Sequence, residues 1–322
     1  MSRTDKMFRT ICAQPIATNW FAICLVICMK NDQAEGLRRR MSQSHDIVAP
    51  EAKVIGVVSG KGGVGKSVFC VNFSIALSQL KKKVLIIDLD IGMGNIEQLM
   101  NSPVKYHIVD WMTGKVPLSE VVAEGPGQIG FISGGNAFLH TFRVGEKDLH
   151  VFLSRMNELK NKYDYILFDF GAGVSDDSLL FILAVNQIIL ITTPEAPALT
   201  DGYSVLKMIC SKNPDLPVSC VVNQVFSAAE GEEAWRRLSR TAERFIGTNI
   251  QWLRSLHHDK AVIRSVKAQV PGIILYPRAR YSTEMKLLAR SFLALNHAES
   301  NAQTFSSFLS KAFHYLKKAG GG

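Results

Sequence analysis

A glycine-rich loop between an apolar strand and a helix constrains this chain more than any other feature. The apolar run at residues 54–59 is followed directly by Gly60-Lys61-Gly62-Gly63-Val64-Gly65-Lys66-Ser67. This spacing is G-x-x-x-x-G-K-[ST], in which backbone N–H groups bind phosphates, the lysine contacts the outer phosphate oxygens and the hydroxyl binds Mg²⁺. A helix that starts at the loop turns its positive end toward the same anion. The pattern predicts a site for ATP and Mg²⁺ from Gly60 to Val68, with a plain glycine turn as the alternative.

The rest of the chain reads as strands alternating with helices. With 322 residues, 47% of them apolar, it is long enough for one large α/β core with terminal appendages. Short apolar runs alternate with helical patterns, which is typical of a parallel sheet covered on both faces. We predict a doubly wound, mostly parallel sheet, whose ligands bind at the carboxyl ends of the strands. The expected strands are residues 54–59, 84–88, 129–133, 165–169, 187–193, 218–223 and 250–253, with helices such as 66–80, 146–161, 177–185, 200–210 and 230–245 between them.

Acidic residues stand at the ends of two of these strands. Residues 84–90 end in Asp88 and Asp90, and the run at 163–169 ends in Asp169 before a small-residue loop that contains Gly171. Carboxylates at positions i and i+2 leave a strand end on the same side, where they can hold Mg²⁺-bound waters and orient an attacking water. The alternative is that such acids cap helices.

The loop and the two acidic strand ends resemble those of the MinD/ParA family of P-loop ATPases. That family has a deviant Walker A loop with an early lysine at the position of Lys61. The resemblance implies that this lysine reaches the nucleotide of a partner chain in an ATP-dependent homodimer. It also implies that Asp90 positions the attacking water, that Asp88 supports Lys66 and the Mg²⁺ shell, and that the backbone of Gly171 lies near the γ-phosphate. The implied catalytic residues are Lys61, Lys66 and Asp90, and the implied metal-binding residues are Ser67, Asp88 and Asp169.

Two further positions concern the nucleotide base, and two positions depart from the family pattern. Asn223 ends a strand, and its carboxamide offers the donor and acceptor that an adenine edge requires. In the family this asparagine contacts the base, although a strand-end turn residue is the alternative. Asp259 occupies the family's second base-contacting loop, where His257 replaces a proline, so we expect a looser loop. Phe170 replaces a small polar residue and is expected to affect the switching rate more than nucleotide binding.

A second motif precedes the loop. Ala34, Leu37 and Met41 lie at i, i+3 and i+7, so a short helix would show one apolar face suited to docking into a groove. The run resembles the D-Q-A-x-x-L-R motif of FlhG (FleN, YlxH), the flagellar branch of the MinD family. The resemblance implies that the segment stimulates FlhF, a GTPase of the signal-recognition-particle type, with Gln33 near the GTP. A generic charged linker helix is the alternative. The implied partner-activating residues are Asp32, Gln33, Ala34, Leu37 and Arg38.

The first residues have a different character. Arg3, Lys6 and Arg9 precede an apolar stretch at 20–29, which superficially resembles a signal peptide. That stretch is about ten residues long, too short to span a bilayer. We expect residues 1–28 to be a doubtful extension upstream of a natural start at Met29, with a membrane anchor as the rival interpretation. Residues 29–50 would then form the partner-activating helix and linker, and residues 51–297 the ATPase domain.

The last residues, 298–322, contain apolar side chains at helical spacing. Lysines such as Lys311 and Lys317 lie off that stripe, which predicts an amphipathic helix in the interface of an anionic membrane. MinD and FlhG carry such a terminal helix, so the resemblance places the protein in the cytoplasm, peripherally on the inner face of the cell membrane. The alternative is that the helix packs on its own domain. The predicted membrane-contacting residues are Phe305, Phe308, Leu309, Phe313 and Leu316.

The charge pattern keeps rival functions open. The net charge is +9, and the basic surplus is concentrated between residues 226 and 290, where it would attract the phosphates of nucleic acid or lipid. The predicted function is an ATP-dependent dimerising switch with slow hydrolysis that regulates flagellar number and placement. Further implied partners are a flagellar transcription activator and flagellar switch proteins. The alternatives are a MinD-type regulator of the division site, a ParA-type ATPase for DNA segregation, and a metabolic ligase that uses the same loop.

Overall fold

Eight strands form one sheet in the computed structural model, which describes residues 51–90, 94–135, 146–298 and 304–319. The strand order is β3-β4-β2-β5-β1-β6-β7-β8, and neighbours are parallel except for β3, which pairs antiparallel with β4 at the edge. The strands are β1 (Lys53–Val58), β2 (Val84–Asp88), β3 (Ala123–Gly125), β4 (Ile129–Ile132), β5 (Tyr165–Asp169), β6 (Gln187–Thr192), β7 (Val218–Val225) and β8 (Ile250–His257).

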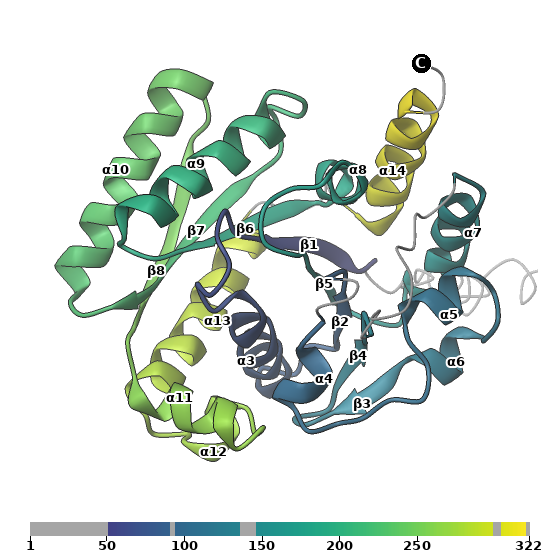
Figure 1. The fold of residues 1–322 in the computed structure, drawn as a ribbon, viewed down its shortest axis with the longest axis horizontal. Helices are drawn as coiled ribbons and strands as arrows, with labels where there is room; N and C mark the ends of the chain where they lie inside the picture. The colour runs from purple at the N-terminus through teal and green to yellow at the C-terminus, as the bar shows by residue number, and fades with distance from the viewer. Residues whose placement is uncertain (1–50, 91–93, 136–145, 299–303, 320–322) are drawn as a thin grey trace, which may run out of the picture. The chain divides into compact units, whose positions relative to one another are not determined.

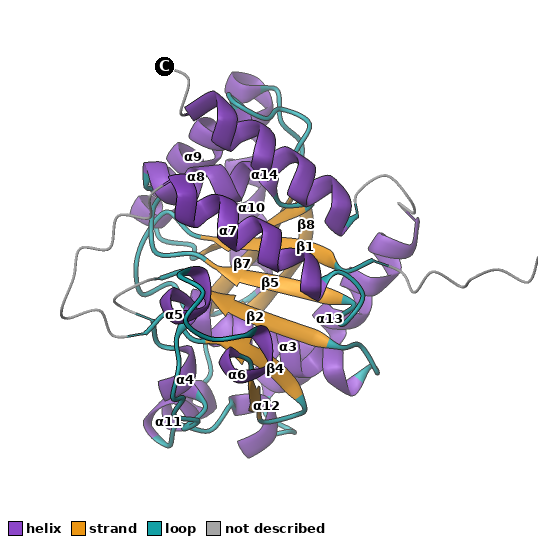
Figure 2. Ribbon diagram, turned by 90° about the vertical axis from the view of Figure 1, so that its right-hand side faces the viewer, coloured by secondary structure: helices purple, strands orange, loops and turns teal. Residues whose placement is uncertain are grey.

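Helices connect the strands and cover both faces of the sheet (Figures 1 and 2). Their bounds are α3 (Lys66–Gln79), α4 (Ile96–Leu99), α5 (Ile108–Met112), α6 (Leu118–Val121), α7 (Glu146–Met156), the 3₁₀ turn η1 (Asn157–Leu159), α8 (Asp176–Ala184), α9 (Ala196–Cys210), α10 (Ala228–Ile246), α11 (Lys260–Lys267), α12 (Gly272–Leu275), α13 (Arg280–Ala298) and α14 (Phe305–Ala319). The helices α3, α12 and α13 cover one face, whereas α7, α8 and α14 lie on the other (Figure 1).

Alternate residues of the central strands enter two separate apolar layers. In β1, Val54 and Val58 join the layer that includes α8 and α14, whereas Ile55 and Val57 join the layer that includes α3 and α13. This division follows from the pleat of a strand, in which successive side chains point to opposite faces. The predicted doubly wound, mostly parallel sheet is confirmed.

Element boundaries differ from the prediction mainly at the far edge of the sheet. All of the predicted strands are present, but β8 continues to His257 rather than ending at residue 253, and β7 continues to Val225. Strand β3 was not predicted, because its sequence Ala-Glu-Gly has no apolar alternation. It forms through backbone pairing with β4, a long-range contact that leaves no local pattern.

The terminal helix α14 is docked on the sheet. Its residues Phe305, Phe308, Ala312 and Leu316 are buried in the same apolar layer as α8, and the helix contacts α7, α8 and β1 (Figure 2). The apolar face that was predicted to lie in a membrane therefore covers the protein's own core in this structure. Leu309 and Phe313 are partly buried and pack against that layer. Residues 304–319 belong to the same compact unit as the ATPase domain.

An acidic residue just before β1 caps this helix. The carboxylate of Glu51 accepts a hydrogen bond from the backbone N–H of Ser306 at 2.8 Å and from the Ser306 hydroxyl at 3.0 Å. Lys160 lies 2.9 Å from the same carboxylate. Burial alone would raise the pKa of Glu51, but the Ser306 N–H, Lys160 and the Ser306 hydroxyl outweigh it and lower the pKa to about 2. The carboxylate thus stands, ionised, at the positive end of α14.

The predictions for residues 1–50 lie outside the described residues. These are the extension at 1–28, the segment at 29–50, and the motif residues Asp32, Gln33, Ala34, Leu37 and Arg38. Within the described ranges, every helix is too short or too polar to cross a bilayer.

Candidate functional site

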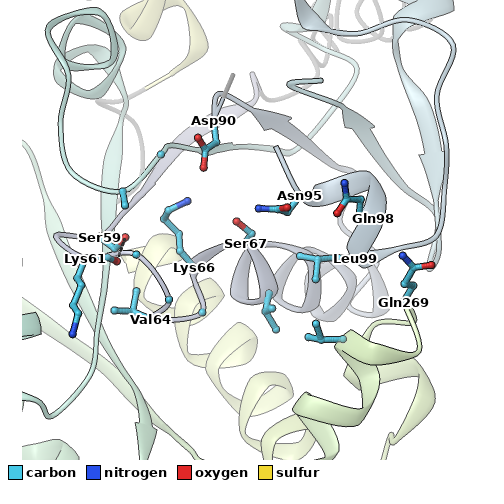
Figure 3. Close-up of a pocket in the computed structure, with 17 residues that line it drawn as sticks. Ser59, Lys61, Val64, Lys66, Ser67, Asp90, Asn95, Gln98, Leu99 and Gln269 are labelled. Carbon is cyan, nitrogen blue, oxygen red and sulfur yellow. Dashed lines mark hydrogen bonds between the residues drawn. The ribbon is translucent and has the colours of Figure 1, made fainter. Parts of the chain in front are cut away.

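The glycine-rich loop lines a cavity at the carboxyl end of the sheet, as predicted. The cavity holds about 720 Å³, and Figure 3 shows its labelled lining residues around Lys66 and Ser67. A Cβ at Gly60 would come within 2.1 Å of the Asp201 backbone, so α9 can approach only a glycine there. Gly65 has a φ of 89°, a left-handed conformation that favours glycine, and it precedes the first residue of α3. The remaining loop residues in the lining are Lys61, Gly62, Gly63, Val64 and Val68.

The lysine of the motif is held in a buried ion pair. Lys66 Nζ lies 2.5 Å from Asp169 Oδ1, and both side chains are almost completely buried. Burial alone would lower the pKa of Lys66, but the Asp169 carboxylate outweighs it and leaves the pKa above its ordinary value. The ammonium therefore stays charged, as phosphate binding requires. Asp88, expected to support Lys66, interacts with it electrostatically and also favours its charged form, whereas the short ion pair is made by Asp169.

The two acids after β2 have different environments. Asp88 is buried and its Oδ1 accepts the backbone N–H of Asp90 at 3.0 Å. Burial raises the pKa of Asp88 well above its usual range, and the nearby Asp169 carboxylate adds to the rise. Asp90 is half-buried and points into the cavity above Lys66 (Figure 3). Asp90 therefore faces the cavity, whereas Asp88 is buried close to it in the chain and does not line the cavity.

The donor set at this edge suits a hydrated magnesium ion. Among the described residues, Asp88 Oδ2 and Asp169 Oδ2 are buried without a hydrogen-bond partner. A buried carboxylate oxygen without a partner is costly unless a cation or an ordered water satisfies it. The Ser67 hydroxyl lines the same cavity. Asp88 and Asp169 are register partners on the neighbouring strands β2 and β5, and together with Ser67 they offer the kind of oxygen ligand that this ion prefers.

A second cavity adjoins the first and contains the predicted base-contacting residues. It holds about 410 Å³, shares Gly63, Gly65 and Val68 with the phosphate cavity, and is lined further by Asn223 and Asp259. The Asn223 amide donates to the Val64 carbonyl at 2.8 Å, so it also supports the phosphate loop. The carboxylate of Asp259 accepts the backbone N–H of Ala261 and caps α11, a role that was not predicted for it.

The expectation of a loose loop at His257 is wrong. His257 is buried at the end of β8, and its backbone N–H donates to Glu284 Oε2 at 2.9 Å. Its ring lies 2.7 Å from Glu284 Oε1 and 2.6 Å from an Arg280 nitrogen. A proline has no N–H to donate, so histidine here adds a contact rather than removing rigidity.

The phenylalanine of the second acidic strand end does not occupy the nucleotide loop. Phe170 is completely buried, and its ring lies edge-on to Phe168 in the apolar layer that contains α14. Gly56 leaves room for it, since a Cβ there would approach the ring to 3.1 Å. The Phe170 ring therefore packs on the other face of the sheet and adds no bulk to the nucleotide loop. Gly171 lines the phosphate cavity beside Asp90.

The early lysine does not engage its own phosphate site. Lys61 Nζ lies 3.2 Å from Glu195 Oε2, and Figure 3 shows its side chain directed away from Lys66 and Asp90. Both side chains are largely exposed, 43% for Lys61 and 65% for Glu195, so the pair is weak.

The sequence analysis did not identify some of the residues that line the phosphate cavity. Asn95, Gln98 and Gln269 carry amides around the cavity, and Asn95 points toward its interior (Figure 3). Asn95 follows the acidic motif directly and could have been found from it, whereas Gln269 comes from a distant segment after α11. Part of the basic surplus also has acidic partners: Arg236 pairs with Glu232, and Arg280 with Glu284.

A glycine-rich loop between a parallel strand and a helix, with a buried lysine and acids at neighbouring strand ends, defines a P-loop nucleoside triphosphatase. Residues 51–292 match the ParA family model, described as "NUBPL iron-transfer P-loop NTPase". The chain belongs to the ParA family of P-loop NTPases.

Comparison with known proteins confirms the resemblance to the flagellar branch. The chain is 26% identical to the antiactivator FleN of Pseudomonas aeruginosa over 78% of this chain and 88% of that protein. It is 28% identical to the flagellum site-determining protein YlxH of Helicobacter pylori, over 82% and 90% respectively. Its fold matches that of the septum site-determining protein MinD of Pyrococcus horikoshii, solved with Mg-ADP. The TM-score is 0.65 at 23% identity, over 78% of this chain and all of that one.

Proposed function

We propose that this protein is an ATP-dependent dimerising switch that regulates flagellar number and placement. The observation that carries the proposal is the similarity to FleN and YlxH, which extends over most of all three chains. The name of the first describes an antiactivator, and that of the second describes a protein that determines the flagellum site. The phosphate cavity with its Lys66–Asp169 pair supplies the nucleotide chemistry that such a switch needs.

The hydrolytic step would use the residues around the cavity. Ser67, Asp88 and Asp169 would hold Mg²⁺, which neutralises charge on the β- and γ-phosphates when it is bound. Lys66 would contact the outer phosphate oxygens after leaving Asp169, and the Gly171 backbone would lie near the γ-phosphate. Asp90 would orient the attacking water from above. We propose slow turnover, because hydrolysis of ATP would serve to reset the dimeric switch and not to supply a product.

Dimerisation would depend on Lys61. Its ammonium points away from Lys66 and pairs with the exposed Glu195, and it can leave that pair at little cost. We propose that it contacts the nucleotide bound by a second copy. Sedimentation with a non-hydrolysable ATP analogue tests this: Lys61→Ala should keep ATP binding and lose the dimer, whereas Lys66→Ala should lose both. Unchanged dimerisation of the Lys61 variant would exclude the role.

The flagellar output would pass through the segment at residues 29–50. We propose that a peptide of residues 29–45 accelerates GTP hydrolysis by the FlhF GTPase. Gln33→Ala should abolish the acceleration, and Leu37→Ala should mainly weaken docking. If the peptide neither binds nor stimulates FlhF, the flagellar function fails and a MinD-type division regulator takes its place. A flagellar transcription activator and flagellar switch proteins are further proposed partners.

Membrane attachment would require α14 to leave the sheet. We propose that the ATP-bound dimer exposes this helix and binds the inner face of the cell membrane from the cytoplasm, with two copies adding avidity. Flotation with anionic vesicles, with and without ATP, tests the proposal. Phe313 is only partly buried, so Phe313→Glu should release the protein from vesicles with less damage to the core than Phe308→Glu. Binding of DNA in place of vesicles would favour the ParA-type alternative.

A further inference from the structure

Helix α13 holds one wall of the second cavity, which contains Asn223 and Asp259 and which we call the base cavity. The wall consists of His257, His258 and Asp259 at the end of β8, which we call the base loop. Helix α13 begins at Arg280, far along the chain, and its first turns lie against this loop. The contacts between them are specific hydrogen bonds rather than apolar packing alone.

Glu284 binds the base loop at its first residue. One carboxylate oxygen accepts the His257 backbone N–H at 2.9 Å, and the other lies 2.7 Å from the His257 ring nitrogen Nδ1. The Glu284 side chain is 15% exposed, so water competes little for these bonds. Losing a partner of this kind leaves buried donors unsatisfied and is costly.

Arg280 fixes the orientation of the same ring. Its nitrogen Nη2 lies 2.6 Å from His257 Nε2, and its Nε donates to Glu284 Oε1 at 3.1 Å. A guanidinium can only donate, so Nε2 must accept and Nδ1 must carry the proton that Glu284 accepts. The ring is thus held from both sides in one tautomer and one position.

Asp259 at the other end of the base loop is fixed in a similar way. Its Oδ1 accepts the N–H of Ala261 at 2.8 Å, and its Oδ2 accepts the N–H of Tyr281 at 3.2 Å. Tyr281 is the second residue of α13 and also lines the base cavity. Both ends of the base loop are therefore attached to the first turns of one helix.

We propose that Glu284 and His257 are positioning residues that set the affinity for the nucleoside base. They act by holding the base loop against the cavity that contains Asn223. The inference rests on the proposed function, because it assumes that the ligand is a nucleoside triphosphate. The phosphate loop is held independently, by Asn223 at Val64 and by the pairing of β1 with its neighbours. Loss of the Glu284 contacts should therefore weaken recognition of the base and spare that of the phosphates.

The experiment compares ATP with inorganic tripolyphosphate, which has no base, by isothermal titration of the full chain with Mg²⁺. Glu284→Ala should weaken ATP binding by about 10-fold, the loss expected from one or two buried hydrogen bonds, and change tripolyphosphate binding by less than about twofold. His257→Ala should do the same, and the double variant should add little, because the two residues act as one unit. Glu284→Gln keeps an acceptor for the His257 N–H and should recover part of the affinity.

Glu232→Ala, which removes an exposed acid from α10, is the matched control and should bind both ligands normally. The ATP-to-GTP affinity ratio should fall in the Glu284 variant, which a loss of general stability would not cause. If the variants bind ATP and tripolyphosphate with equally reduced affinity, or with unchanged affinity, the inference is overturned. If the unaltered chain binds no ATP, the proposed function itself fails.

Discussion

Replacing Glu51 with glutamine should loosen α14 without disturbing the nucleotide site. The carboxylate accepts hydrogen bonds from the Ser306 N–H and hydroxyl at the N-terminus of α14, and it also pairs with Lys160. Glutamine keeps the size of the side chain and one acceptor oxygen. It removes the negative charge that favours the positive end of the helix and the pairing with Lys160. The change therefore tests the charge rather than the packing.

The expected effect is moderate. A fall in the Glu51 pKa from 4.5 to about 2 corresponds to about 3 kcal/mol of interaction with the ionised form. Solvent screens part of this interaction, because the carboxylate is not fully buried, so glutamine should forfeit about 2 kcal/mol. Phe305, Phe308 and Leu316 on α14 itself are buried against the core, and burial of each contributes about 1.5 to 3 kcal/mol to docking. The helix should therefore stay mostly docked, while its undocked fraction rises about 30-fold.

Hydrogen–deuterium exchange read by mass spectrometry measures such a minor state. Peptides from α14 should exchange about 30-fold faster in Glu51→Gln than in the unaltered chain, while α13 peptides should not change. Glu232→Gln, an exposed acid in an ordinary helix pair, is the control. Equal acceleration throughout the fold would mean a global effect, and unchanged α14 exchange would refute the capping argument.

The Glu51 carboxylate should make the docking of α14 depend on pH. A carboxyl group whose folded pKa is lowered stabilises the folded state above its ordinary pKa, and this contribution is lost as the pH falls toward the folded value. Protection of α14, corrected for the intrinsic exchange rate, should therefore decline from about pH 4.5 toward about pH 2. Glu51→Gln should not show this decline, because it has no proton to bind in that range.

Three further predictions concern the nucleotide site. Asp90→Ala should slow ATP hydrolysis by about 10²-fold and leave ATP binding intact, which single-turnover and binding assays separate; unaltered turnover would make the residue structural. Asp169→Asn leaves the buried Lys66 ammonium without its counter-charge, so the free energy of unfolding, measured in urea without nucleotide, should fall by about 3 to 5 kcal/mol. A fall of less than about 1 kcal/mol would contradict a buried ion pair. Glu195→Ala releases Lys61 and should strengthen the ATP-dependent dimer in sedimentation, whereas a weaker dimer would give Glu195 an interface role.

Local sequence patterns predicted the central sheet and the phosphate site because both depend on neighbouring residues. The loop at 60–67 carries its own geometry, and Asp88, Asp90 and Asp169 come to one edge because parallel strands end there. Lys66 lay in the predicted cavity, but its short ion pair with Asp169 was not predicted, because it depends on the register of β2, β5 and β1.

Tertiary contacts decided the features that were not predicted. The apolar stripe of α14 suits a membrane and a sheet equally well, and only the neighbouring α8 and β1 show which surface it covers here. Similarly, the absence of the family proline at His257 predicted a loose loop, whereas the structure fixes this loop through Glu284 on α13. Neither partner could be identified without the fold.

The alternation of β5 has a thermodynamic consequence. Asp169 pairs with the phosphate-loop lysine Lys66, while its neighbours Phe168 and Phe170 face the opposite apolar layer, where the Phe168 ring lies 5.6 Å from that of Phe308 on α14. Only one backbone therefore separates the carboxylate of the phosphate site from the terminal helix. If ATP binding changes the docking of α14 by some factor, linkage requires that a surface capturing α14 change ATP affinity by the same factor. A membrane that binds this helix would then act as an effector of the nucleotide site as well as a place of attachment.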